Sequence, residues 1–406
     1  MNRRSKDLNR MLVWKALVFL MSICVGYSSC GAQETPQHQS TVPVQKSTEN
    51  VGHEISKGIK TPVGLMSYLY VTNRLDNTIT AYRIATDGTL EVVEGGTVAT
   101  GEEPAGILVG HSNDYLYVAN FGDNTISVYR IGGNGSAWPL PGSTIHAGTN
   151  PTCISMTPSG DRLYVTNSGF LSTSGGDTVS GYTVIANGKL KPTAGSPFKT
   201  GVNPDGLAVS KAGNYLYVSS VRNRTISGYR IEPGGALSEL NGSPFPAGSG
   251  ADKIAITPDG FHLYVANTTG GNISGYSVDL SGALHLVDGS PFDAEGETVE
   301  GLAVSPSGKL LVATIVGDMT GVLVFRVETD GSLVPLVSGY VAIVGGDLRG
   351  ITFSPDGRFV YVANFGSTGP NGILGFKVRT DGSLSPLNQN GFAAGAGPWA
   401  MAVAIH

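Results

Sequence analysis

A short strand-like segment is repeated along most of the chain and constrains the fold more than any other feature. It reads SYLYVTN up to Asn73, DYLYVAN up to Asn120 and RFVYVAN up to Asn364, with related versions between them. The anchoring residues of the seven copies are Tyr70, Tyr117, Tyr164, Tyr217, Tyr264, Leu311 and Tyr361, which lie 47, 47, 53, 47, 47 and 50 residues apart. A fixed period of this length indicates a repeat architecture in which each copy is one supersecondary unit.

Each copy contains four strand-like segments separated by turn residues. The first segment of a copy is an apolar run, which occupies residues 207–210 in the fourth copy. A turn follows, which reads Pro-Asp-Gly at 258–260 in the fifth copy, and the LYVAN-like segment comes next. A third segment reads TISVYRI at 125–131, and a fourth follows an Asp-Gly turn, as at 330–336. Four antiparallel strands in about 47 residues form one propeller blade. The sequence therefore predicts an all-β, seven-bladed β-propeller over residues 63–406, with four antiparallel strands per blade.

The two ends of the repeat region complement each other. The last copy is followed by PWAMAVAI at 398–405, a first-strand pattern with no second strand after it, whereas the first copy begins with a second strand at 68–73. We therefore expect the C-terminal strand to close the first blade. A Gly-Ser-Pro-Phe motif follows the fourth strand in three copies, and we expect Phe198, Phe245 and Phe292 to pack between neighbouring blades.

The N-terminus has the features of an export signal. A basic leader precedes an apolar run at 11–25 that is short for a membrane span, and small residues precede Cys30. The sequence predicts a signal peptide over 1–29 and a polar, disordered tether over 30–62. Lipidation of Cys30 would give a membrane-anchored lipoprotein, periplasmic or at the cell surface; plain secretion and an uncleaved anchor are the alternatives. Cys153 then has no disulfide partner, and we expect it to be a small buried apolar residue.

Charge and motif content exclude several kinds of partner. Removing residues 1–29 leaves 26 − 5 = 21 basic against 31 − 1 = 30 acidic residues, a balance of −9 that disfavours nucleic acid and anionic lipid. We therefore expect membrane contact only through a lipid at Cys30. The sequence carries no HExxH, CxxC, GxSxG or P-loop motif, and its seven histidines form no metal set. We expect a monomer without cofactor or metal.

The LYV(A/T)N and TIS segments over seven blades resemble the lactonase-type β-propellers, which include bacterial 6-phosphogluconolactonase, and the exported propellers with Tyr-Val-Thr-Asn repeats. The resemblance implies a lactonase activity carried by His, Arg and acidic residues around the mouth of the central channel, with a Gly-Pro-Arg-His segment opening one first strand. The comparable segment here is Gly250-Ala251-Asp252-Lys253. Asp252 stands in the place of the Arg and Lys253 in that of the His, so the family's catalytic signature is not matched, and the catalytic residues are unknown.

One residue near the start of each first strand is expected to line the channel mouth on the top face. These residues are Ala105, Thr152, Asp205, Asp252, Glu300, Arg349 and Trp399. We expect this ring to lie at solvent. It is either a polar rim whose charges neutralise one another, or a ligand site. In a ligand site, Arg349 and Lys253 would hold a carboxylate or phosphate, and Trp399 would supply an apolar platform. A carboxylate with a raised pKa would serve as general base.

Two functions fit these features. The first, which the missing signature and the expected export favour narrowly, is a scaffold that binds a small molecule, polymer or protein through the channel mouth. The alternative is a hydrolase of sugar lactones or similar compounds that uses the channel-mouth carboxylates and Arg349. The extra residues at 168–177 would form either a gate over the mouth or a tolerated insertion. The asparagines that end the second strands are expected to be turn formers.

Overall fold

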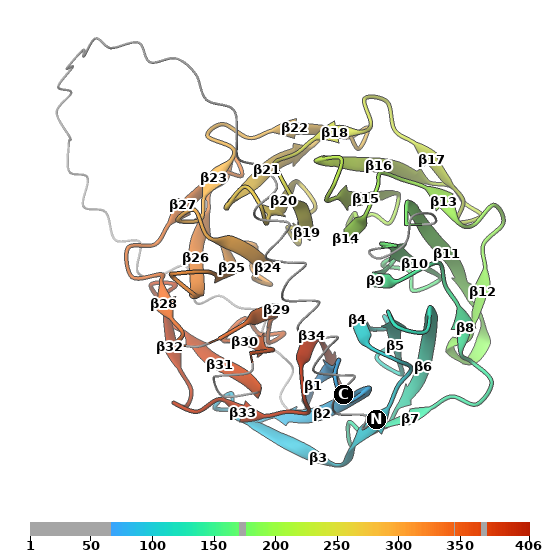
Figure 1. Ribbon diagram of the computed structural model, residues 1–406, viewed down its shortest axis with the longest axis horizontal. Helices are drawn as coiled ribbons and strands as arrows, with labels where there is room; N and C mark the ends of the chain where they lie inside the picture. The colour runs from blue at the N-terminus through green and yellow to red at the C-terminus, as the bar shows by residue number, and fades with distance from the viewer. Residues whose placement is uncertain (1–65, 170–175, 345, 367–371) are drawn as a thin grey trace, which may run out of the picture. The chain divides into compact units, whose positions relative to one another are not determined.

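The computed structural model describes residues 66–169, 176–344, 346–366 and 372–406. Seven antiparallel sheets surround a central axis, each with one strand nearest the axis and one at the perimeter (Figure 1). The predicted seven-bladed β-propeller is therefore confirmed. The described residues contain one short 3-10 turn, η1 (Ala186–Gly188), and no helix long and apolar enough to cross a membrane.

The strands occupy equivalent places in each blade. The inner strands are β34 (Pro398–Ile405), β4 (Pro104–Val109), β9 (Pro151–Met156), β14 (Pro204–Val209), β19 (Ala251–Ile256), β24 (Thr298–Val304) and β29 (Leu348–Phe353). The second strands are β1 (Ser67–Asn73), β5 (Tyr115–Asn120), β10 (Arg162–Asn167), β15 (Tyr215–Ser220), β20 (His262–Asn267), β25 (Leu310–Val316) and β30 (Phe359–Asn364). The third strands are β2 (Thr78–Ile84), β6 (Thr125–Ile131), β11 (Thr178–Val184), β16 (Thr225–Ile231), β21 (Asn272–Val278), β26 (Gly321–Val327) and β31 (Gly372–Val378).

The outer, fourth strand is continuous only in the first blade, as β3 (Leu90–Ala99). In the other six blades it is split into two pieces that both pair with the third strand. The pieces are β7 (Ala137–Pro139) and β8 (Ile145–His146), β12 (Leu190–Pro192) and β13 (Phe198–Lys199), β17 (Leu237–Glu239) and β18 (Phe245–Pro246), β22 (Leu284–Leu286) and β23 (Phe292–Asp293), β27 (Leu333–Pro335) and β28 (Val341–Ala342), and β32 (Leu384–Pro386) and β33 (Phe392–Ala393). Short edges of this kind limit pairing with other chains.

The first blade is closed by the C-terminal strand, as the sequence predicts. β34 pairs antiparallel with β1, placing Tyr70 opposite Ala402, and the sheet order is β3-β2-β1-β34. The backbone N–H of His406 donates to the carbonyl of Met66 at 2.8 Å, so the two ends of the described domain are hydrogen-bonded to each other.

Buried tyrosines tie six of the seven blades to the next one, the exception being the sixth blade, which has Leu311 at this position. The Tyr70 hydroxyl donates to the carbonyl of Gly135 in the following blade at 2.8 Å. The equivalent bonds join Tyr117 to Gly188, Tyr164 to Gly235, Tyr217 to Gly282, Tyr264 to Gly331 and Tyr361 to Gly88. Each acceptor glycine has a positive φ, which suits glycine in a tight turn. The bond from Tyr361 joins the seventh blade to the first and completes the ring.

A second set of tyrosines points back toward the preceding blade. The third-strand residues Tyr82, Tyr129, Tyr182, Tyr229 and Tyr276 donate to the outer-strand carbonyls of Ala393, Ala99, His146, Lys199 and Pro246. Most blade interfaces therefore carry hydrogen bonds in both directions, in addition to apolar packing.

The predicted interblade phenylalanines are confirmed in two of three cases. Phe245 is buried in a cluster that contains Tyr217 and Ala251, from the fourth and fifth blades. Phe292 packs against the cluster of the fifth and sixth blades, whereas Phe198 is half-buried and lies over Gly181 of its own blade. Cys153 is a free, partly buried thiol that packs against the apolar cluster of the third and fourth blades.

Deleting residues 398–406 is expected to abolish the cooperative unfolding of the propeller. Without β34, the second strand β1 loses its inner partner and the first blade loses the contacts that close the ring. Thermal unfolding followed by near-ultraviolet circular dichroism tests this, with deletion of residues 1–62 as a control that should keep the parent transition. A cooperative transition near the parent temperature in the C-terminal deletion would contradict the expectation.

Candidate functional site

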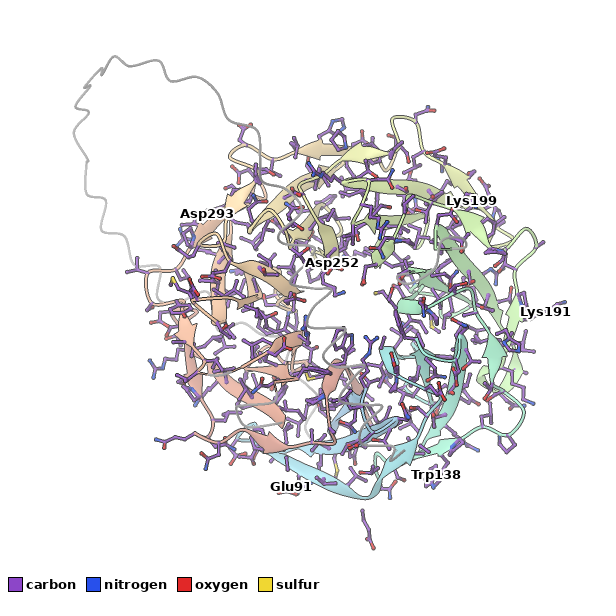
Figure 2. The ribbon with its side chains drawn as sticks, in the orientation of Figure 1. Glu91, Trp138, Lys191, Lys199, Asp252 and Asp293 are labelled. Carbon is purple, nitrogen blue, oxygen red and sulfur yellow. The ribbon has the colours of Figure 1, made fainter. Side chains whose placement is uncertain are left out.

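A β-bulge at the same place in every inner strand creates the ring around the axis. In each blade, two inner-strand residues oppose a single residue of the second strand, and the regular register resumes beyond them. The first bulged residue of each pair belongs to the predicted ring: Ala105, Thr152, Asp205, Asp252, Glu300, Arg349 and Trp399. A bulge re-aims side chains that a regular strand would send to the sheet faces. Figure 2 shows Asp252 beside the central axis, whereas Lys191, Lys199 and Asp293 lie at the perimeter.

The second bulged residue is usually glycine because neighbouring bulges touch. A Cβ at Gly206, Gly301 or Gly350 would meet the carbonyl oxygen of the next blade's ring residue. The first and third blades have Ala400 and Cys153 at this position, and the fifth has Lys253, which carries a long, charged side chain into the ring. Asp252 and Lys253 are thus the two residues of one bulge, which explains why opposite charges stand at the head of a strand.

Second-strand hydroxyls hold several bulges in place. Ser219 accepts a hydrogen bond from the N–H of Gly206 at 2.9 Å and donates to the carbonyl of Asp252 in the next blade. Thr166 accepts from Cys153 and donates to the carbonyl of Asp205 at 2.8 Å. The equivalent hydroxyls of Thr72 and Thr314 bond the carbonyls of Ala105 and Arg349, and the other three blades have Ala119, Ala266 and Ala363 at this position.

Lys253 bridges two carboxylates from adjacent blades. Its Nζ lies 2.6 Å from Oδ1 of Asp205 and 3.0 Å from Oδ1 of Asp252. Burial disfavours the charged ammonium, but the two carboxylates outweigh this effect and raise the pKa of Lys253. Lys253 is therefore a permanent cation whose charge is matched by two partners.

Asp252 is a carboxylate whose surroundings favour its protonated form. Its side chain is 15% exposed. Burial, together with the charges of Asp205 and Glu300, raises the pKa of Asp252 to about 7 against the opposing effect of Lys253. Asp252 therefore exchanges a proton near neutral pH, which is the property required of a general acid or base.

Arg349, like Lys253, bridges two carboxylates, here one from the sixth blade and one from the seventh. Nη1 lies 2.7 Å from Oε2 of Glu300, and Nη2 lies 2.7 Å from Oδ1 of Asp347. Burial disfavours the charged guanidinium, yet these two carboxylates raise the pKa of Arg349. Its Nε is buried and has no hydrogen-bond partner among the described residues.

Arg74, which the sequence reasoning missed, joins the ring from the end of β1. Its guanidinium lies 4.4 Å from the centroid of the Phe121 ring and 4.5 Å from that of Trp399, and Nη2 lies 3.2 Å from Oε2 of Glu103. The Arg349 guanidinium also lies over Trp399, at 5.0 Å. Burial lowers the pKa of Arg74 in spite of Glu103, and the positive charge of Arg349 lowers it further.

The structure brings the predicted site residues together but corrects their setting. Asp205, Asp252, Lys253, Glu300 and Arg349 were expected at solvent, whereas their side chains are only 13–31% exposed. They are half-buried because consecutive bulges lie in contact around the axis. Trp399 was expected to be an apolar platform for a ligand; two guanidinium groups of the protein lie over its ring, and Phe365 packs edge-on against it at 5.5 Å.

The asparagines that end the second strands lie close to the ring. Asn120, Asn167 and Asn267 are fully buried, and their side-chain amides donate to hydroxyl or amide oxygens of the third strand, as Asn120 does to Thr125 and Ser127. They brace neighbouring strands, so the expectation of simple turn formers was wrong.

Of the predicted gate at 168–177, residues 170–175 lie outside the described residues. Within the described ranges, no group of three or more His, Cys, Asp or Glu residues is arranged to hold a metal.

Comparison with known proteins agrees with the architecture. A family model described as lactonase, 7-bladed beta-propeller, matches residues 66–169 and 170–346. The chain belongs to this lactonase family. A search of proteins with curated functions finds no match.

Solved structures similar to this member of the lactonase family share its fold at low sequence identity. A periplasmic gluconolactonase from Pseudomonas aeruginosa is 21% identical, with a TM-score of 0.70, over 84% of this chain and 99% of that one. A proposed 6-phosphogluconolactonase from Bacteroides fragilis is 18% identical, with a TM-score of 0.72, over 85% of this chain and 99% of that one. At this identity the likeness establishes the fold alone.

Replacing Ser219 by alanine is expected to destabilise the protein by about 1–3 kcal/mol, because a buried N–H of Gly206 and a buried carbonyl of Asp252 lose their partner. The neighbouring Ser220 provides a matched control. Its Oγ is buried without a hydrogen-bond partner in the described part of the chain, so Ser220→Ala should be close to neutral. Urea unfolding of both variants checks this, and equal losses of stability would contradict the role assigned to Ser219.

Proposed function

We propose that this protein hydrolyses lactones at the ring around its axis, with Asp252 as the general base. The observation that carries the proposal is the placement of Asp252, on a bulge beside the axis, half-buried between Lys253 and two further carboxylates. Membership of the lactonase family supports the reaction class.

The groups of the ring suit the chemistry of lactone hydrolysis. The ionised carboxylate of Asp252 accepts a proton from a water molecule as that water attacks the lactone carbonyl carbon. Negative charge then develops on the carbonyl oxygen, which can accept a hydrogen bond from the one N–H of Lys253 that Asp205 and Asp252 leave over. When the ring C–O bond breaks, the ring oxygen leaves with its electron pair and takes the proton from Asp252. The carboxylate is restored, and the product is an open-chain hydroxy acid.

Binding without turnover is the second candidate. It is favoured by the segment Gly250–Lys253, which has Asp and Lys where the family's enzymes are expected to have Arg and His. In that case the same ring would bind a ligand that it does not transform. The two candidates differ in whether Asp252 exchanges a proton with the bound molecule.

Substituting Asp252 by asparagine is expected to lower kcat/KM by roughly 10²–10⁴-fold, the usual contribution of a general base. In the parent, kcat/KM should rise with pH through about 7, because Asp252 acts as a base only when ionised. Rates for a panel of lactones between pH 5 and 9, corrected for spontaneous hydrolysis, give both quantities. Asp293→Asn, an equivalent change at the perimeter, should behave as the parent.

Each possible result of this assay decides between the candidates. An Asp252→Asn variant as active as the parent would remove Asp252 from the mechanism. A parent that hydrolyses no lactone in the panel, yet retains ligand binding that depends on Arg349 or Trp399, would establish the binding protein instead.

We further propose that the protein acts outside the cytoplasm, anchored by a lipid on Cys30. The basic leader, the short apolar run and the small residues before Cys30 support this. In bacterial cells making the full chain, mass spectrometry should find the mature protein beginning at an acylated Cys30, and Cys30→Ala should move it from the membrane fraction to the soluble fraction. An unprocessed chain in the cytoplasmic fraction would refute the proposal.

A further inference from the structure

The charges of the ring are paired with one another, which determines the kind of molecule it accepts. The network contains three cations, Arg74, Lys253 and Arg349, and five carboxylates, Glu103, Asp205, Asp252, Glu300 and Asp347. Its net charge is therefore 3 − 5 = −2 with Asp252 ionised and −1 with Asp252 protonated. The two cations expected to hold an anion, Lys253 and Arg349, each already contact two carboxylates.

We infer that the site takes an uncharged lactone and excludes lactones that carry a phosphate or carboxylate; this rests on the function proposed above. It departs from the expectation that Arg349 and Lys253 hold a carboxylate or phosphate. The reason is that both cations are already paired with carboxylates of the protein, so their positive charge is not available to an anionic ligand.

Binding an anion at Arg349 would require breaking ion pairs that are half-buried. Glu300 and Asp347 lie 2.7 Å from the two Nη atoms, the pair of donors that a phosphate or carboxylate would use. Displacing either carboxylate leaves it unpaired in a site where its side chain is only 18% or 29% exposed, which is costly. The N–H groups that remain are one on each Nη and the buried one on Nε, and an anion that accepted from the Nη groups would lie beside Glu300 and Asp347.

The same argument applies to Lys253. Asp205 and Asp252 lie within 3.0 Å of Nζ, and any anion that approached Nζ would also approach these carboxylates and Glu300. Like charges brought together at short range in a half-buried site oppose binding. The hydroxy acid formed by hydrolysis is itself an anion at neutral pH, so the network also favours release of the product.

The test compares an uncharged aldonolactone with its 6-phosphate. In the parent, kcat/KM should be at least about tenfold higher for the uncharged lactone, which corresponds to about 1.4 kcal/mol. In Asp347→Asn, Arg349 loses one of its carboxylates, so the ratio should fall toward one or reverse. Asp293→Asn, which changes the net charge of the protein equally at the perimeter, should leave the ratio at the parent value.

A binding measurement separates this inference from the proposed function. Calorimetry with a hydrolysis-resistant lactam of the same sugar and with its 6-phosphate reports selectivity without turnover. Tighter binding of the uncharged lactam supports the inference even if no lactone is hydrolysed. Tighter binding of the phosphorylated lactam, binding of neither, or a parent that prefers the phosphorylated lactone would overturn it.

Discussion

The hydrogen bond from a second-strand tyrosine to a glycine carbonyl of the next blade sets the geometry on which the rest of the structure depends. One such bond contributes only about 1 kcal/mol, but a buried carbonyl left without it would cost more. The bond between Tyr361 and Gly88 extends the series across the junction between the chain's last blade and its first. Burial raises the pKa of these tyrosines, so the hydroxyls keep their protons over the whole range in which the protein is expected to work. Because the blades are fixed to one another in this way, their inner strands present equivalent bulges at one level around the axis.

The site follows from a departure from regular structure that all seven blades share. The bulge frees two residues per blade from the ladder, and the second of them is glycine wherever the next bulge comes too close for a side chain. The first residue differs from blade to blade, so the repeat maintains the fold while the ring position is left for the function that we propose. Charged or aromatic residues occupy the ring position in five consecutive blades, from Asp205 through Asp252, Glu300 and Arg349 to Trp399, whereas the second and third blades have Ala105 and Thr152 at this position. The ring is therefore polarised toward one side of the axis.

The seven blades, the closure by the C-terminal strand and the positions of the ring residues could all be predicted from the sequence, because each depends on spacing within a repeat. The electrostatic setting could not. Arg74 and Asp347 lie outside the ring position, and the contacts of Arg74 with Trp399 join residues that are 325 positions apart, since 399 − 74 = 325. The half-burial of Asp252 depends on the approach of neighbouring backbones, which no local pattern encodes. A weak signal did exist for the hydroxyls that hold the bulges: the equivalent position of the repeated segment is Thr or Ser in four copies and Ala in three, and only the hydroxyl form can bond the next blade.

The pairing of Lys253 with two carboxylates bears on both the reaction and the selectivity that we propose for the ring. A metal ion held by the same carboxylates would be exchangeable and would present open coordination positions to an anionic ligand. A lysine fixed in the bulge holds Asp205 beside Asp252 instead, and its three donors are directed mainly to the protein. With Asp205 and Glu300 nearby, burial keeps the Asp252 carboxyl partly protonated even though an ammonium group touches it. Asp205 and Glu300 thus have two effects: with burial they raise the pKa of Asp252, and they occupy the positive charges of Lys253 and Arg349. An arrangement of this kind cannot supply the base without also disfavouring an anionic substrate.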